Sequence, residues 1–209
     1  MVKLQGPMFS LAASGTLAKT LTYSHWKGRA FARRRIIPGN PQSGGQVSLR
    51  SMFAFLGAEW GGLATAAQDT WIAPAAATII SPFNAFCASG LDRNRSFLAP
   101  SQVYPVAPAA PVDNIGLFIA AGQVRAISML ISVPFVAQSP WGYLLYISAS
   151  TGFTPAFSNL VKVIPHIPPV GGFFVLTDVA PGTWYLDVKT FAPNGYIGSL
   201  AGEQSAVVT

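Results

Sequence analysis

Charged side chains are scarce in this sequence. Asp, Glu, Lys and Arg together make up 10% of its 209 residues, against about a quarter in an average soluble domain. Hydrophobic residues make up 51%, and the mean hydropathy is +0.42. This balance excludes a disordered chain. It also leaves too little polar surface to coat an isolated monomer, so we expect part of the apolar excess to lie against neighbouring subunits, further copies of the chain included.

The sequence is also poor in residues that carry out catalysis or bind metals. Cys87 is the single cysteine, so no internal disulfide can form, and His25 and His166 are the only histidines. Their spacing matches no zinc motif and no nucleophile and base unit. The seven carboxylates are scattered, and the pair Gly44 and Gly45 lacks the Lys and Ser or Thr of a phosphate-binding loop. We therefore expect no enzyme activity, no metal site and no cofactor.

Long uninterrupted apolar runs are absent as well. The charge-free stretch 126–161 is broken by Pro134, Pro140 and Gly142, and the pieces between them are shorter than the roughly 20 residues of a spanning helix. Near the amino terminus, Lys3 is followed by polar and turn-forming residues rather than by the apolar core of a secretory signal. We expect no membrane span, and synthesis in the cytoplasm.

The charge that is present gathers near the amino terminus. Eight cations and one carboxylate give residues 1–60 a net charge of +7, whereas five cations and six carboxylates give residues 61–209 a net charge of −1. Such a local basic region binds either nucleic acid or an acidic face on a partner protein.

A β-hairpin is predicted within the basic region. Residues 20–24 and 29–37 are compatible with strands, and Gly28 supplies the turn between them. Because side chains alternate along a strand, Arg33 and Arg34 lie on opposite faces. A strand with arginine on both faces cannot be a buried central strand, so we expect it to lie on a partner. The predicted partner-binding residues are Tyr23, Trp26, Lys27, Arg29, Arg33, Arg34, Arg35 and Arg50.

Apolar residues at helical spacing follow the predicted hairpin in the sequence. Apolar residues predict one longer helix that ends at Gly61 and Gly62, and two shorter helices follow, of which the first ends at Pro74. We expect these helices to form one thin core of their own, completing an N-terminal anchoring domain over residues 1–99. The apolar stripe of the longer helix comprises Leu49, Met52, Phe53, Leu56 and Trp60, of which Phe53 and Trp60 are expected to hold the local core.

The remainder of the chain predicts β-structure. Four prolines in residues 100–111 indicate a stiff linker. Seven short strands then follow within residues 112–209, which is typical of a β-sandwich. The predicted fold class is α+β and mainly β, with a hairpin arm and short helices before a seven-stranded sandwich. The strands are expected at residues 115–120, 124–133, 143–148, 160–164, 173–177, 183–191 and 204–208.

Part of the second half resembles fibronectin type III modules. Residues 179–188, read as VAPGTWYLDV and followed by Pro193, Asn194 and Gly195, are similar to the corner between strands E and F and to the next hairpin of that family. The resemblance implies a fibronectin or immunoglobulin-like sandwich. It leaves open whether Trp184 or Tyr185 takes the place of the family's corner tyrosine.

The first half is similar to virion proteins of tailed bacteriophages. The resemblance covers about residues 14–100 and implies a structural role in the particle, without a position within it. It is carried by Tyr23, Lys27, Gly28, Arg29, Arg34, Pro38, Asn40, Pro41, Gln46, Arg50 and Phe53, followed by Trp60, Trp71, Phe83 and Asn84.

Three functions remain open from the sequence. The first is a structural virion protein, in head decoration, the head–tail joint or the tail, that packs against capsid, portal-associated or tail subunits through the basic arm. The second is a nucleic-acid-binding protein that uses the same arm. The third is a receptor-facing or carbohydrate-binding module with Trp141, Tyr143 and Tyr196 as a stacking platform. The first is preferred, and it places the protein in the virion after synthesis in the host cytoplasm.

Overall fold

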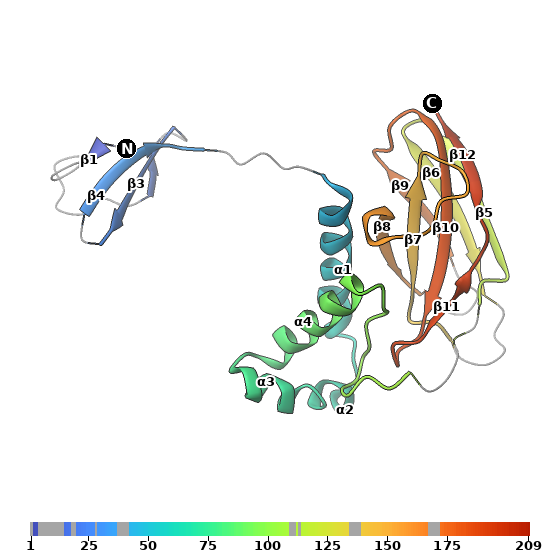
Figure 1. The fold of residues 1–209 in the computed structure, drawn as a ribbon, viewed down its shortest axis with the longest axis horizontal. Coiled ribbons are helices and arrows are strands. Elements are labelled where there is room, and N and C mark those ends of the chain that lie inside the picture. Colours follow the sequence, from blue (N-terminus) through green and yellow to red (C-terminus); the bar gives the residue numbers. More distant parts are fainter. Residues whose placement is uncertain are drawn as a thin grey trace. The chain divides into compact units, whose positions relative to one another are not determined.

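The structure is a computed structural model that describes residues 2–3, 15–17, 20–27, 29–36, 42–108, 112, 114–133, 139–166 and 172–209. The chain divides into two compact units, the N-terminal unit (Met1–Pro41) and the C-terminal unit (Gln42–Thr209). Strands outnumber helices, the sheets are antiparallel and the helices are short (Figure 1). This confirms the predicted class, a mainly β protein that also contains helices.

The N-terminal unit holds the predicted hairpin within a small antiparallel sheet. Trp26 pairs with Arg29, so a two-residue turn joins the central strands. Lys27 in this turn has a φ of 48°, as the tight turns that match the twist of a hairpin require. The strand order is β1–β4–β3–β2, with β1 at Val2–Lys3, β2 at Gly15–Leu17, β3 at Leu21–Trp26 and β4 at Arg29–Arg34.

Four helices open the C-terminal unit. They are α1 (Gly44–Trp60), α2 (Thr65–Asp69), α3 (Ile72–Thr78) and α4 (Pro82–Arg95). The start of α4 is fixed by the Ser81 hydroxyl, which accepts a 3.2 Å hydrogen bond from the Asn84 backbone N–H. Pro74 does not end a helix as predicted. It lies in the first turn of α3, where the backbone N–H has no helical partner and a proline is tolerated.

In the described part of the C-terminal unit, eight strands follow the helices and form two antiparallel sheets. Each of the seven predicted strands is present, and β11 was missed because its four residues include a glycine and a serine. The ten residues of β10 pair with β12 along their first half and with β11 along their second half. One sheet has the order β5–β6–β9 and the other has the order β11–β10–β7–β8 with β12 also on β10. The bounds are β5 Leu117–Gln123, β6 Ala126–Ser132, β7 Gly142–Ser148, β8 Leu160–Pro165, β9 Gly172–Thr177, β10 Gly182–Phe191, β11 Ile197–Leu200 and β12 Gln204–Val208.

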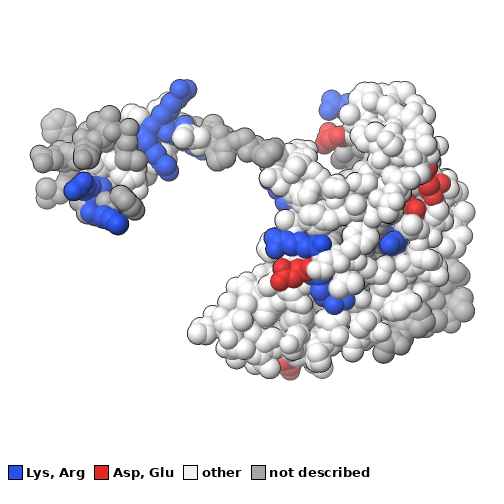
Figure 2. Space-filling view, in the orientation of Figure 1, with Lys and Arg blue, Asp and Glu red and all other residues white. Residues whose placement is uncertain are grey.

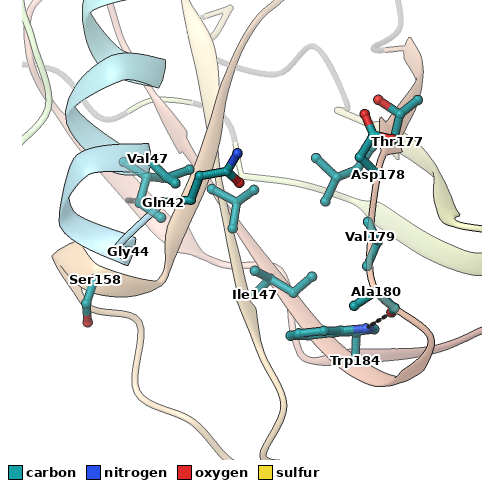
Figure 3. A pocket seen from close by; sticks show the side chains of 13 residues that line it. Gln42, Gly44, Val47, Ile147, Ser158, Thr177, Asp178, Val179, Ala180 and Trp184 are labelled. Carbon is teal, nitrogen blue, oxygen red and sulfur yellow. Dashed lines mark hydrogen bonds between the residues drawn. The ribbon is translucent and has the colours of Figure 1, made fainter. Parts of the chain in front are cut away.

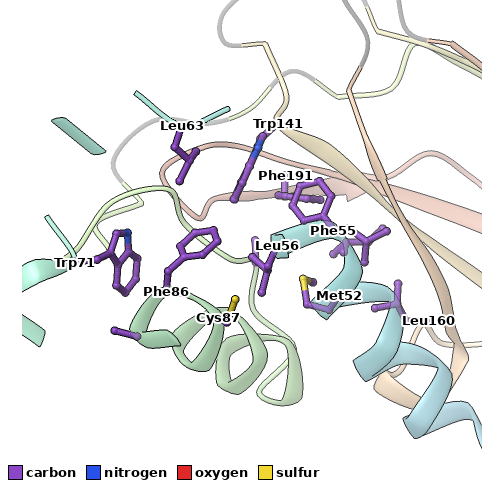
Figure 4. Packing of buried hydrophobic residues seen from close by; sticks show 14 of the residues in the cluster. Met52, Phe55, Leu56, Leu63, Trp71, Phe86, Cys87, Trp141, Leu160 and Phe191 are labelled. Atoms are coloured by element: carbon purple, nitrogen blue, oxygen red, sulfur yellow. The ribbon is translucent and has the colours of Figure 1, made fainter. Parts of the chain in front are cut away.

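The five-stranded sheet lies between the helices and the three-stranded sheet. In β7, Tyr143 and Leu145 contribute to the core between the two sheets, while Leu144 and Tyr146 contribute to the core beneath the helices. All four side chains are buried, which explains why β7 is an almost unbroken apolar run. The helix-side core also contains Met52, Phe55, Leu56, Trp71, Phe86, Leu160 and Phe191 (Figure 4).

Helix α1 is fastened directly to the sheet. The Val163 backbone N–H of β8 donates a 2.6 Å hydrogen bond to the Ser51 hydroxyl, and Phe55 of α1 contacts the rings of Trp141 and Phe191. Phe53, which was expected to hold a local helical core, is half exposed, because the buried stripe of α1 runs through Met52, Phe55 and Leu56 instead. The helices therefore have no separate thin core, and the prediction of one is wrong.

The observed division of the chain differs from the predicted one. The two compact units meet at Pro41, whereas the sequence suggested domains of residues 1–99 and 112–209. The described part of the expected linker is pinned in place: the Trp71 indole N–H donates to the Gln102 carbonyl at 2.9 Å, and the Gln102 N–H donates to the Pro193 carbonyl at 2.8 Å. These bonds tie the proline-rich segment to both the helices and the sheet, so it is part of the C-terminal unit.

Candidate partner-binding surface

All charged side chains of the N-terminal unit are basic. Its seven cations are accompanied by no Asp or Glu within residues 1–41, which gives it a net charge of +7. The C-terminal unit has six cations and seven carboxylates, hence a net charge of −1. Blue side chains accordingly gather on the N-terminal unit, while the visible face of the C-terminal unit is mostly uncharged (Figure 2). The N-terminal unit cannot neutralise its own charge, so its counter-charge must come from outside it.

Strand β4 distributes its arginines over both sheet faces. Arg33 lies opposite Thr22 and Arg34 lies opposite Leu21, and neighbouring residues of a strand point to opposite faces. Arg29 shares the face of Arg33, about 13 Å along the strand. These three side chains are exposed, which agrees with the prediction of arginine on both faces.

Arg35 extends the basic strand past its last sheet pair. Its backbone N–H donates a 2.7 Å hydrogen bond to the Thr20 carbonyl, which holds it beside β3 while its side chain stays exposed. Among the described residues, the ion pair within 4 Å joins Arg95 to Asp92 on α4, not any arginine of β4. The guanidinium groups of the strand are therefore free to form bidentate bonds with carboxylates or phosphates of a partner.

The remaining predicted partner-binding residues divide between the two units. Tyr23 lies half-buried in β3, opposite Ala32, and Lys27 lies in the exposed turn. Trp26 is placed by its backbone alone, paired with Arg29, and its side chain lies outside the described part. Arg50 is exposed on α1 in the C-terminal unit. The structure thus gathers all of the predicted set except Arg50 in one small sheet.

The C-terminal unit has a groove that the sequence did not reveal. Its volume is about 520 Å³, within the range of ligand-binding clefts. Trp184 and Ile147 lie on its apolar side, and Asp178 is the one ionisable residue of the lining (Figure 3). The Trp184 indole N–H is already engaged by the Ala180 carbonyl at 2.8 Å. A described lining with one carboxylate and no second ionisable group suits binding of a neutral group better than acid–base chemistry.

The expected aromatic stacking platform is not formed. Trp141 and Tyr143 are buried, and only Tyr196 of the three rings is exposed. The Tyr143 hydroxyl forms a 2.5 Å hydrogen bond with His166 Nδ1, and burial raises the pKa of Tyr143 to about 12. Desolvation of the His166 ring lowers the pKa of His166. Trp141 is covered by the helices, and this contact could not be predicted from the alternation of apolar residues along the strands.

Asp187 and Cys87 are buried titratable groups of the C-terminal unit. The Asp187 carboxylate accepts hydrogen bonds from the backbone N–H groups of Val188 at 2.8 Å and Gly202 at 3.2 Å. Desolvation nevertheless raises the pKa of Asp187, and it raises the pKa of Cys87 to about 11. Within the described part of the chain, no three His, Cys, Asp or Glu side chains lie together as metal ligands would.

Among the described helices, no single one is long and apolar enough to cross a bilayer. The segments Thr65–Thr78 and Pro82–Arg95 meet the length and composition requirement together, with a 90° bend between them.

Comparisons with known proteins give no family. No known protein family and no curated protein matches the chain. Among solved structures, a family 76 glycoside hydrolase from a bovine Bacteroides thetaiotaomicron strain is 13% identical with a TM-score of 0.34, over 46% of this chain and 20% of the hydrolase. A beta-1,2-glucanase from Parabacteroides distasonis is 16% identical with a TM-score of 0.34, over 48% of this chain and 14% of the glucanase. The PKD domain of an M14-like peptidase from a Thermoplasmatales archaeon is 17% identical with a TM-score of 0.25, over 47% of this chain and 94% of that domain.

Proposed function

We propose that this chain is a non-catalytic structural component of a tailed-phage virion, in head decoration, the head–tail joint or the tail. The N-terminal unit binds acidic surfaces of other virion subunits, and the C-terminal unit is the folded body that it attaches. The observation that carries the proposal is a 41-residue sheet unit with seven cations and no carboxylate.

Size supports the need for a partner. A unit of about 40 residues buries too little apolar surface to be stable alone without disulfides, metals or association. This one has no cysteine, and its edge strands β1 and β2 have two and three residues. Docking on another subunit supplies the missing burial and the missing negative charge together.

We also propose a fibronectin type III-like sandwich for the two sheets of the C-terminal unit. The strands β5, β6 and β9 share one sheet and the strands β7, β8 and β10 share the other, as in Greek-key sandwiches of this kind. At the start of β10, the Trp184 indole N–H bonds to the Ala180 carbonyl four residues upstream. That bond supports Trp184, rather than Tyr185, as the residue that takes the place of the corner tyrosine.

The assembly role is tested by charge reversal in the full chain. Phage carrying Arg33→Glu and Arg34→Glu are compared with phage carrying Arg125→Glu and Lys162→Glu, two exposed cations of the C-terminal unit. Both pairs change the net charge by the same amount. We expect incorporation into purified particles to fall at least tenfold for the first pair and to stay near wild type for the second. Equal incorporation of both would overturn the assembly role of the basic sheet.

Nucleic-acid binding is the second candidate, because Phe31 lies between Arg29 and Arg33 on one face of β4. Aromatic and basic side chains in this order suit stacked bases and phosphates. Binding to a single-stranded DNA is measured against salt concentration for wild type and for Arg33→Ala, Arg34→Ala and Arg35→Ala. A steep salt dependence that disappears in the triple variant supports this candidate over the protein partner.

A further inference from the structure

The outer face of the three-stranded sheet is both apolar and exposed. Alternation along β5, β6 and β9 sends one set of side chains into the core, including the buried Phe118, Ile127 and Met129. The opposite set points to solvent and forms what we call the apolar sheet face. Its large members are Leu117, 47% exposed, Ile119, 47%, Leu130, 41%, Phe173, 65%, and Val175, 38%.

The strand register joins these side chains into one continuous surface. Ile119 pairs with Leu130, and Leu130 pairs with Phe173, so the three form a row across all three strands. The other outward positions of these strands carry small or uncharged residues, and β5, β6 and β9 contain no Asp, Glu, Lys or Arg. The solvent side of an antiparallel sheet is ordinarily polar. A contiguous apolar face of this kind is typical of an interaction surface.

The absence of charged residues on the apolar sheet face indicates which partner packs against it. An acidic or basic partner finds no opposite charge on the apolar sheet face, and its own charged groups would lose hydration without compensation. The N-terminal unit, at +7, is unsuited for the same reason, whereas the C-terminal unit is close to neutral at −1. A second copy presents the same uncharged face, and a twofold axis brings identical faces together without unpaired charge.

We infer that the apolar sheet face packs against the same face of a second copy, with the twofold axis close to Leu130. The five large side chains expose on the order of 500 Å² per copy, so two copies bury about 1,000 Å², the size that a specific interface needs. This pairing deepens the proposed assembly role but requires no acidic partner. It therefore stands or falls separately from the basic sheet.

The full-length chain is tested by sedimentation equilibrium over a range of concentrations. Leu130→Lys places a charge at the centre of the face, and Leu200→Lys is the matched control, because Leu200 lies on β11 and is also 41% exposed. We expect a wild-type dimer, a dissociation constant at least tenfold higher for Leu130→Lys, and a change of less than about twofold for Leu200→Lys. Thermal unfolding of each variant shows whether the fold is retained. Phe173→Thr, which keeps a strand-forming residue, is expected to weaken the dimer as well.

Two further measurements separate this interface from the basic sheet. The charge-reversal variant with Arg33→Glu and Arg34→Glu should keep the dimer, and added salt should leave it intact because no charge is buried. A Leu130→Cys variant should cross-link to itself through a short bis-maleimide, since Cys87 is buried and does not compete. A monomeric wild type, an unaffected dimer in a folded Leu130→Lys, or cross-linking at Leu200→Cys instead of Leu130→Cys would each overturn the inference.

Discussion

The Trp141 indole N–H donates a 2.8 Å hydrogen bond to the Glu59 carboxylate, joining the residue before β7 to the end of α1 across 82 positions of sequence. Trp141 is buried against Phe55 and Phe191, so this bond lies at the edge of the helix-side core. It fixes the helices and the five-stranded sheet as parts of one folded unit.

Removing that bond should weaken the C-terminal unit. Trp141→Phe retains an aromatic ring but loses the donor to a charged acceptor, so we expect the free energy of unfolding to fall by about 2 kcal/mol. Glu59→Gln keeps an acceptor oxygen and should cost less than half as much. Urea unfolding of both variants and of the double variant gives the coupling between the residues. Additive effects would show that the bond contributes nothing.

Close packing between α1 and α4 gives a second prediction. A Cβ at Gly90 of α4 would lie 2.5 Å from Leu56 Cδ1 and 3.0 Å from Cδ2, and Leu56 is fully buried. Gly90→Ala should therefore destabilise the fold by about 1–3 kcal/mol. Gly57→Ala on α1 is the control, because open space surrounds its Cβ position. The control should gain about 0.5–1 kcal/mol from better helix propensity, as measured by urea unfolding.

The single thiol reports on the integrity of the helix layer. Burial raises the pKa of Cys87 to about 11, so at pH 8 the folded chain holds almost none of the reactive thiolate. We expect a disulfide reagent to label Cys87 slowly in buffer and rapidly in urea, with the labelling midpoint at the unfolding midpoint. Fast labelling of the folded chain would mean that the helices do not cover Cys87.

Asp187 gives a pH-dependent prediction. Desolvation raises the pKa of its carboxyl above the ordinary 3.8, so the folded state holds this proton more tightly than the unfolded state does. Its contribution to stability is complete below the ordinary pKa and is lost as pH rises through the raised one. Asp187→Asn cannot ionise and keeps an acceptor for the Val188 and Gly202 N–H groups. The variant should gain stability relative to wild type between pH 4 and pH 7, as measured by urea unfolding at each pH.

Local elements were readable from the sequence because their signals are local. Ser81 and Pro82 mark the start of α4, and the alternation around Arg33 and Arg34 places cations on both faces of β4. The packing of the helices on the five-stranded sheet could not be predicted, because the apolar stripe of α1 does not indicate which element it packs against. The strongest hint was the apolar run of β7 (GYLLYIS), which is typical of a strand buried on both faces.

The groove beside Trp184 and the apolar sheet face depend on tertiary contacts. The groove is lined by segments from residue 42 to residue 184, and no local pattern brings them together. In β5 and β9 both the inward and the outward positions carry mostly apolar residues, so the sequence of these two strands did not distinguish the core side from the exposed side.

Electron cryo-microscopy of the intact particle tests the central claim most directly. We predict that residues 1–41 lie in an interface with another virion protein and that the guanidinium groups of Arg33, Arg34 and Arg35 lie within hydrogen-bonding distance of its carboxylates. Density that places this basic sheet against packaged DNA, or leaves it facing solvent in an otherwise ordered subunit, would contradict the account.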